Sequence, residues 1–171
     1  VWLLIVALMK QDTSKELRRG WTTGACATAA TKAALQRLWG GDFAGDVTIT
    51  LPKGETPVFA LALAEAGDGW ARVGITKDAG DDPDVTHGAL IVVTVRGSSG
   101  GIAFRAGAGV GTVTKAGLPI GVGEPAINPV PRQMMTAEVL ALAAEFDKAP
   151  DVEIEVAIPG GEEIALKTWN P

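Results

Sequence analysis

The feature that most constrains how this chain can fold is a helix predicted over residues 22–39, whose buried face is almost wholly alanine. Thr22 or Thr23 can cap its free amides, and the glycine pair after residue 39 ends it. Small residues recur at helical spacing on one face and polar residues on the other: Cys26, Ala30, Ala33 or Ala34 and Leu38, against Lys32, Gln36 and Arg37. Because an alanine side chain is a single methyl group, this helix can lie very close to a sheet or a ligand.

Strand-like segments and a second helix follow. β-Branched or alternating residues predict strands at residues 46–51, 58–66, 70–76, 89–96, 102–106 and 152–158. The turn at 67–69 predicts a hairpin, and a second hairpin is expected where residues 159–161 lead into 162–167. Apolar residues at helical spacing predict a helix over residues 134–148. The predicted fold class is α+β: a two-layer domain with a mixed or mostly antiparallel sheet and two helices packed on one face.

Length and charge narrow the classes of protein. A chain of 171 residues is long enough to bury a core. A formal net charge of −5 argues against nucleic acid as a partner. The apolar run over residues 1–9 is much shorter than the roughly 20 residues that span a bilayer, and it lacks the features of a signal peptide. The single cysteine, Cys26, fits a reducing compartment and a small core residue, so we expect a cytoplasmic protein without a membrane partner.

An acidic stretch over residues 77–88 carries four carboxylates. It also contains one lysine, Lys77, and the only histidine of the chain. Like charges so close repel unless a cation or hydrogen-bond donors meet them. The stretch is therefore either a solvated turn or part of a site, and the candidate catalytic residues are Asp78, Asp81, Asp82, Asp84 and His87. His87 is interpreted first as a hydrogen-bond partner of the loop backbone, with a general base as the alternative. No metal site is expected, because no second soft ligand lies nearby in the sequence.

A glycine- and proline-rich stretch over residues 107–132 is too apolar for disorder and predicts an ordered loop packed against the domain. Two motifs are excluded by their context. The G-x-S-x-G match at 97–101 is followed by a strand rather than a helix, which excludes a nucleophile elbow. The G-x-G-x-x-A match at 121–126 follows no strand, and the prolines at 125, 129 and 131 argue against the helix that a dinucleotide needs.

Three segments together resemble a known family. Their order and spacing resemble those of the CbiD family of cobalamin biosynthesis. The segments are residues 17–27 (LRRGWTTGACA), residues 77–86, and the pair 109–114 (GVGTVT) and 125–132 (PAINPVPR). The resemblance implies an enzyme that transfers a methyl group from S-adenosylmethionine to ring carbon C1 of cobalt-precorrin-5B, giving cobalt-precorrin-6A, in anaerobic cobalamin synthesis. S-adenosylmethionine is then the methyl donor, and cobalt enters only as part of the corrinoid substrate.

The resemblance also implies roles for individual residues. Carboxylates of the acidic stretch can accept hydrogen bonds from the donor's ribose or ammonium group and can favour its sulfonium. Cations and backbone amides are expected to meet the acetate and propionate groups of the corrinoid. The candidate binding residues are Arg18, Arg19, Thr22, Thr23, Gly24, Lys77, Gly109, Gly111, Thr114, Asn128 and Arg132, with Lys115 as a further nearby cation. Asn128 and Arg132 are favoured because prolines on either side fix the loop that presents them.

Members of this family continue into a second, glycine-rich α/β domain. We therefore expect residues 1–16 to be an N-terminal extension outside the fold, residues 17–167 to form the α+β domain, and residues 168–171 to begin a truncated second domain. A homo-oligomer or pairing with the missing C-terminal domain would complete the site. The alternative function is a non-catalytic module that binds corrinoid or assists assembly. A phosphate-handling kinase is a distant third, since no P-loop lysine motif is present.

Overall fold

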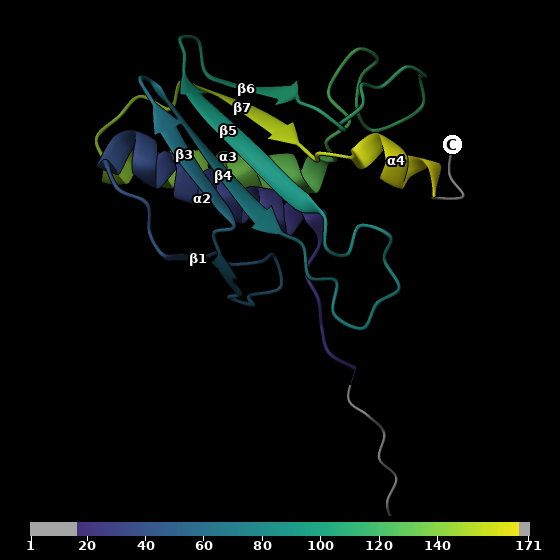
Figure 1. Ribbon diagram of the computed structural model, residues 1–171. Coiled ribbons are helices and arrows are strands. Elements are labelled where there is room, and N and C mark those ends of the chain that lie inside the picture. Colours follow the sequence, from purple (N-terminus) through teal and green to yellow (C-terminus); the bar gives the residue numbers. More distant parts are fainter. Residues whose placement is uncertain (1–16, 168–171) are drawn as a thin grey trace, which may run out of the picture.

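A five-stranded mixed sheet with two long helices on one face organises residues 17–167, the part of the chain that the computed structural model describes (Figure 1). The N-terminal extension expected at 1–16 and the second domain expected from 168 lie outside these residues. The strands lie in the order β3 (Leu63–Gly67), β4 (Trp70–Thr76), β5 (Leu90–Gly97), β7 (Val152–Ala157) and β6 (Ile102–Ala106). Neighbours are antiparallel except for β6 and β7, which are parallel. The predicted α+β fold class is confirmed.

Helix α2 (Thr23–Gly40) is the alanine-rich helix of the sequence, and it packs across β4 and β5. The hydroxyl of Thr22 accepts a hydrogen bond from Ala25 N–H at 3.0 Å, and Gly41 ends the helix with φ +93°. Nearly every side chain between Ala25 and Leu35 is buried, because the sheet covers one side of α2 and helix α3 covers another. The alanines thus serve two interfaces, whereas the sequence pattern indicated one.

Helix α3 (Pro129–Glu145) begins five residues before the predicted start at residue 134. The prolines were wrongly interpreted as part of an irregular loop. In the first turn of a helix, proline's missing N–H leaves no bond unmade and its φ is already helical. The two helices run parallel, because Gly24 at the start of α2 lies against Pro131 and Gly40 at its end lies against the Phe146 ring. A Cβ at Gly24 would stand 2.6 Å from the Pro131 ring, which shows how closely the helices approach.

The final strand is inserted between two earlier strands. The chain leaves β6, passes through α3 and returns as β7, which lies between β5 and β6, as a parallel crossover requires. The hairpin expected after residue 158 is wrong: helix α4 (Gly161–Leu166) forms there instead. Both edges of β7 are already paired, so a following strand has no partner to join. The two glutamates of its first turn also favour a helix start.

The strand predicted at 58–66 is divided. Its first part is β2 (Val58–Ala60), which pairs with β1 (Asp46–Thr48) in a separate two-stranded sheet, and its second part is β3 of the main sheet. The hairpin predicted at residues 67–69 is confirmed by the antiparallel pairing of β3 with β4. Within residues 17–167, no helix is both long and apolar enough to cross a membrane.

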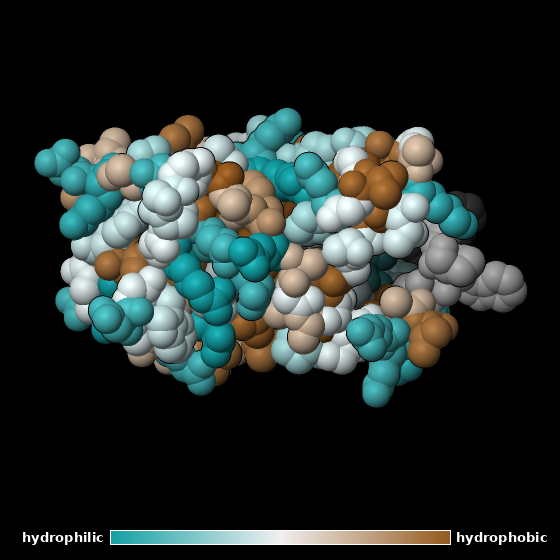
Figure 2. Space-filling model, turned by 90° about the horizontal axis from the view of Figure 1, so that it is seen from above, coloured by the Kyte–Doolittle hydropathy of each residue, from teal (hydrophilic) through white to brown (hydrophobic). Residues whose placement is uncertain are grey.

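The two faces of the main sheet differ in chemistry. Val73, Val93 and Val156 stand opposite one another on the helix-facing side and are buried. The other side carries ion pairs between neighbouring strands, including Arg105 with Glu153 at 2.7 Å. Seen from above, the molecule shows hydrophilic side chains across the middle and hydrophobic ones in small separate groups (Figure 2). The core therefore lies between the sheet and the helices.

Candidate active site

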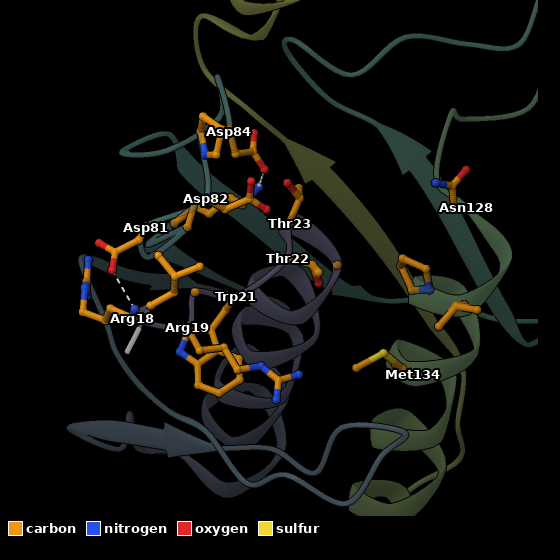
Figure 3. Close-up of a pocket in the computed structure, with 18 residues that line it drawn as sticks. Arg18, Arg19, Trp21, Thr22, Thr23, Asp81, Asp82, Asp84, Asn128 and Met134 are labelled. Atoms are coloured by element: carbon orange, nitrogen blue, oxygen red, sulfur yellow. Dashed lines mark hydrogen bonds and ion pairs between the residues drawn. The ribbon is translucent and has the colours of Figure 1, made fainter. Parts of the chain in front are cut away.

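A cleft of about 1,040 Å³ opens where the starts of α2 and α3 meet the acidic stretch and the segment before α2. Figure 3 shows the acidic loop on one side, Thr22 and Thr23 at the start of α2, and Met134 and Asn128 on the α3 side. Segments far apart in the chain thus supply its walls. Ten of the candidate residues line it: Arg18, Arg19, Thr22, Thr23, Gly24, Lys77, Asp81, Asp82, Asp84 and Asn128.

The acidic loop is fastened to the segment before α2 by backbone pairing. Trp21 N–H donates to the Asp78 carbonyl at 2.8 Å, and the N–H of Asp81 donates to the Arg18 carbonyl at 2.9 Å. The Asp81 carboxylate in turn accepts from Arg18 N–H at 2.6 Å. A Cβ at Gly20 would overlap the backbone at residue 79, and one at Gly80 would overlap the Arg18 carbonyl. Both glycines are therefore required for the two backbones to lie this close.

An arginine neutralises the first carboxylate of the loop. The Arg18 guanidinium donates two hydrogen bonds to Asp78, at 2.6 and 2.9 Å, in a bidentate pair. The side-chain hydrogen bond from Arg18, helped by Gly80 N–H, holds the pKa of Asp78 below its ordinary value. Asp78 does not line the cleft. In the structure this carboxylate ties the loop to the segment before α2.

A buried lysine holds the far end of the loop. The Lys77 side chain is only 4% exposed, and its ammonium donates to Asp84 at 2.5 Å and to the Thr86 hydroxyl. Asp84 also accepts from Thr86 N–H at 2.8 Å. These hydrogen bonds, first that from Lys77, hold the pKa of Asp84 well below its usual range. Lys77 thus binds the loop itself, although the sequence placed it among the ligand-binding residues.

His87 faces the loop rather than the cleft. Its Nδ1 accepts a hydrogen bond from Ala79 N–H at 3.0 Å and lies 3.9 Å from an Asp78 oxygen. Accepting this bond requires Nδ1 to be unprotonated. The backbone interpretation of His87 therefore agrees with the geometry, and a general base facing the cleft does not.

The start of α2 presents Thr23 and Gly24 at the cleft, in front of a small buried residue. Cys26 is fully buried, and burial raises the pKa of its thiol to about 11. A thiol with that pKa is uncharged near neutral pH, so Cys26 is a core residue and not a nucleophile.

Asn128 and Arg132, the two candidates at the start of α3, differ in their placement. Asn128 lines the cleft and occupies the N-cap position, yet its side chain makes no capping hydrogen bond. Arg132 does not line the cleft, since its guanidinium donates to the carbonyls of Ile127 and Pro125 and pairs with Glu124. The structure therefore uses Arg132 to hold the loop against the helix start.

The structure places Gly109, Gly111 and Thr114 away from the cleft. Gly109 has φ +74°, and a Cβ there would overlap the Ile158 carbonyl at the end of β7. The Gly111 carbonyl accepts from Ala126 N–H at 2.8 Å, which closes the neck of the loop. The loop is ordered as predicted, Gly109 and Gly111 shape it, and none of the three candidates lines the cleft. Their binding role stays a prediction.

The sequence interpretation missed eight of the residues that line the cleft, among them two large side chains. Trp21 lines the cleft and packs edge-on against Phe59, and Met134 lines it from α3. Trp21 lies inside the quoted segment 17–27, so its aromatic side chain was the available signal. Among residues 17–167, no three histidine, cysteine, aspartate or glutamate side chains come together as a metal site would require.

The fold and cleft define a class: an α+β domain whose loops and helix starts enclose a site of small-molecule size. The chain belongs to the CbiD family, whose model matches residues 10–171. It is 66% identical over 157 residues to the cobalt-precorrin-5B C(1)-methyltransferase of Paramagnetospirillum magneticum, covering 91% of this chain and 44% of that protein. The protein of the same name from Rhodospirillum rubrum is 62% identical, with 94% of this chain and 44% of that protein covered.

A solved structure agrees with this assignment. The crystal structure of the cobalamin biosynthesis protein CbiD from Archaeoglobus fulgidus matches with a TM-score of 0.66 and 32% sequence identity, over 90% of this chain and 48% of that one. The chain thus spans a little less than half the length of the relatives it matches.

Proposed function

We propose that this chain is part of an enzyme that methylates ring carbon C1 of cobalt-precorrin-5B with S-adenosylmethionine, giving cobalt-precorrin-6A in anaerobic cobalamin synthesis. Membership of the CbiD family supports this proposal, as does the name shared by the most similar relatives above. A cytoplasmic location belongs to the same proposal.

The observation that carries the proposal is the meeting of separate segments at one cleft. The acidic stretch, the Thr-Thr-Gly start of α2 and the Asn128 end of the long loop are at least 40 residues apart in sequence, yet residues of all three line the same cleft. A structural turn needs no such convergence. Methyl transfer needs it, because holding the methyl group and the attacking carbon in line supplies much of the rate.

The cleft's residues fit a sulfonium donor. S-adenosylmethionine supplies an electrophilic methyl group on a positively charged sulfur. Asp81 and Asp82 offer carboxylates beside the cleft, and Trp21 offers an aromatic surface for a base or a cation. The ordered walls hold these groups in place before a ligand binds.

The relatives' additional length suggests how the cleft is completed. We include in the proposal a second domain, or a second copy of the chain, that closes the open side and contributes further ligand contacts. Its presence would exclude water from the reacting atoms.

Methyl transfer from labelled S-adenosylmethionine to cobalt-precorrin-5B tests the proposal. The chain would be assayed alone and mixed with the remaining C-terminal portion of the Rhodospirillum rubrum relative. We expect turnover in the mixture and little with the chain alone. Corrinoid binding without methyl transfer in either sample would favour the alternative, a binding or assembly module.

A further inference from the structure

Three segments leave the main sheet at the same end. β4 ends there and β5 begins there, since Thr76 pairs with Leu90, and β7 ends beside them, since Val92 pairs with Ala157. β6 is parallel to β7 and ends with it. The acidic stretch between β4 and β5, the long loop after β6 (residues 107–128) and α4 after β7 therefore lie together (Figure 1). We call this the cleft end of the sheet, because the cleft opens beside the acidic stretch.

Most of the large hydrophobic side chains that are exposed among residues 17–167 belong to segments of the cleft end. Six of the eight are there: Leu17 and Val130, which line the cleft, Val85 of the acidic stretch, Leu118 and Val122 of the long loop, and Leu166 of α4. The other two stand singly on β2 and α3. The turns at the opposite end, 67–69 and 97–101, consist of glycine, serine and aspartate. Exposed apolar side chains that gather in this way mark an interaction surface, whereas scattered single ones are normal.

The tip of the long loop, residues 114–122, is closed by a hydrogen-bonded neck. Val113 N–H donates to the Glu124 carbonyl at 2.9 Å, and the Val113 carbonyl accepts a second backbone hydrogen bond from across the neck at 2.7 Å. Leu118 and Val122 are nevertheless 61% and 60% exposed. Since backbone hydrogen bonds already order this loop, its apolar side chains are free to contact a partner.

The length of the relatives indicates which partner covers this surface. This chain covers 44% of the Paramagnetospirillum magneticum and Rhodospirillum rubrum proteins, so each has more residues outside the matched part than within it. α4 is the last element of the domain and starts against the long loop, because a Cβ at Gly161 would stand 2.5 Å from the Gly109 carbonyl. In a full-length relative, residues that follow this domain therefore begin beside the exposed side chains.

The composition of the cleft end also favours a tethered domain over a stable dimer. Charged residues separate its apolar side chains, among them Lys115 and Glu124 of the long loop and the aspartates of the acidic stretch. Contacts between domains of one chain have this mixed character, whereas permanent dimer interfaces are more apolar. A covalent link also gives an effective concentration on the order of millimolar, so a weak contact is enough.

We propose that the cleft end is the surface on which the remaining C-terminal portion of the full-length protein docks, with Leu118 and Val122 as apolar anchors outside the cleft. This inference rests on the proposed function, which includes a second domain or a second copy, and it selects the domain. Leu17 and Val130 line the cleft at the same end, so docking there also closes the cleft to water.

Maleimide labelling of an introduced cysteine tests the inference. Leu118→Cys would be labelled in the 171-residue chain alone and in a fusion of that chain to the remaining portion of the Rhodospirillum rubrum relative. We expect labelling about ten-fold slower in the fusion, as an effective concentration about ten times the Kd would give. Leu140→Cys, at a position 52% exposed on α3, is the matched control and should react at one rate in both proteins. The buried Cys26 stays unlabelled while the domain is folded.

Equal labelling rates at residue 118 in the two proteins would overturn the inference, as would protection of residue 140 instead. Protection of residue 118 in the chain alone that increases with its concentration would overturn it in favour of a second copy. Hydrogen exchange of the intact Rhodospirillum rubrum relative gives a reading that needs no fusion. The residues aligned with 114–122 should be more protected there than in this chain, and equal protection would count against docking.

The two proposals can fail separately. Methyl transfer by the fusion with residue 118 still labelled at the full rate would leave the proposed function standing and remove the docking surface. Protection of residue 118 without methyl transfer would have the opposite meaning.

Discussion

Replacement of Gly20 by alanine should detach the acidic loop from the segment before α2. The new Cβ would overlap the backbone at residue 79, and neither side is a flexible side-chain end that can turn away. The two backbones must therefore separate. Separation breaks the hydrogen bonds that join residues 18–21 to residues 78–81.

The size of the effect follows from those bonds. Three hydrogen bonds donated by backbone N–H groups join the segments, in addition to the Arg18–Asp78 side-chain pair: Trp21 N–H to the Asp78 carbonyl, Asp81 N–H to the Arg18 carbonyl, and Arg18 N–H to the Asp81 carboxylate. At a net contribution of about 1 kcal/mol each, their loss lowers the free energy of unfolding by about 3 kcal/mol. For a domain of this size, that corresponds to a fall in melting temperature of about 6–12 °C.

Thermal unfolding and amide hydrogen exchange measure the change together. We expect faster exchange at Trp21 and Asp81 in Gly20→Ala, along with the lower melting temperature. Gly45→Ala is the control, because a Cβ there meets nothing within 4 Å. If Gly20→Ala had the same melting temperature as Gly45→Ala and the same slow exchange at Trp21 and Asp81, the close approach of the two backbones would not be what holds this wall of the cleft.

Further predictions concern the buried groups near the cleft. Lys77→Met should lower the free energy of unfolding by about 2 kcal/mol, less than for a fully buried pair because Asp84 is 34% exposed, and urea titration measures this. Asp84, whose folded pKa is depressed, contributes stability that is present above its unfolded pKa of about 4 and is lost as the pH falls through the folded pKa. Asp84→Asn should therefore flatten the acid side of the stability profile, and a profile as steep as that of the unsubstituted chain would contradict this. Cys26, with its pKa near 11, should resist iodoacetamide at pH 8 and react only after unfolding; rapid labelling of the native chain would refute its burial.

Local patterns predicted most of the fold. The bounds of β4 and β6 agree with the sequence, because each is a regular apolar run between turn residues. The secondary-structure predictions failed where contacts between distant segments determine whether a strand or a helix forms. Residues 162–167 carry apolar and polar residues that suit a strand or a helix, and only the paired edges of β7 exclude the strand. The early start of α3 could have been predicted, since proline in a first helical turn is a recognised start signal.

The sequence predicted which segments form the candidate site, but not what each side chain in them contacts. Sequence alone indicated that the acidic stretch and the Thr-Thr-Gly start matter, and the structure brings both to one cleft. It could not indicate that Lys77 points into the protein to bind Asp84, because a lysine in sequence gives no sign of its burial. The partners of Arg132 could not be predicted either, because its carbonyl partners are brought together only once the loop has folded. Whether these residues act on a ligand stays a prediction.

The position of β7 between β5 and β6 has a consequence for how the protein is made. β5 and β6 follow each other in sequence but do not pair, so β6 has no strand beside it until residues 152–157 arrive. During synthesis the ribosome releases β3, β4 and β5 as a sheet with an open edge, and the apolar side of β5 stays uncovered there until the last strand inserts. Contacts between residues so far apart in sequence form slowly and leave intermediates prone to aggregate. A nascent chain stopped before residue 152 should therefore recruit chaperones more strongly than one stopped after residue 157.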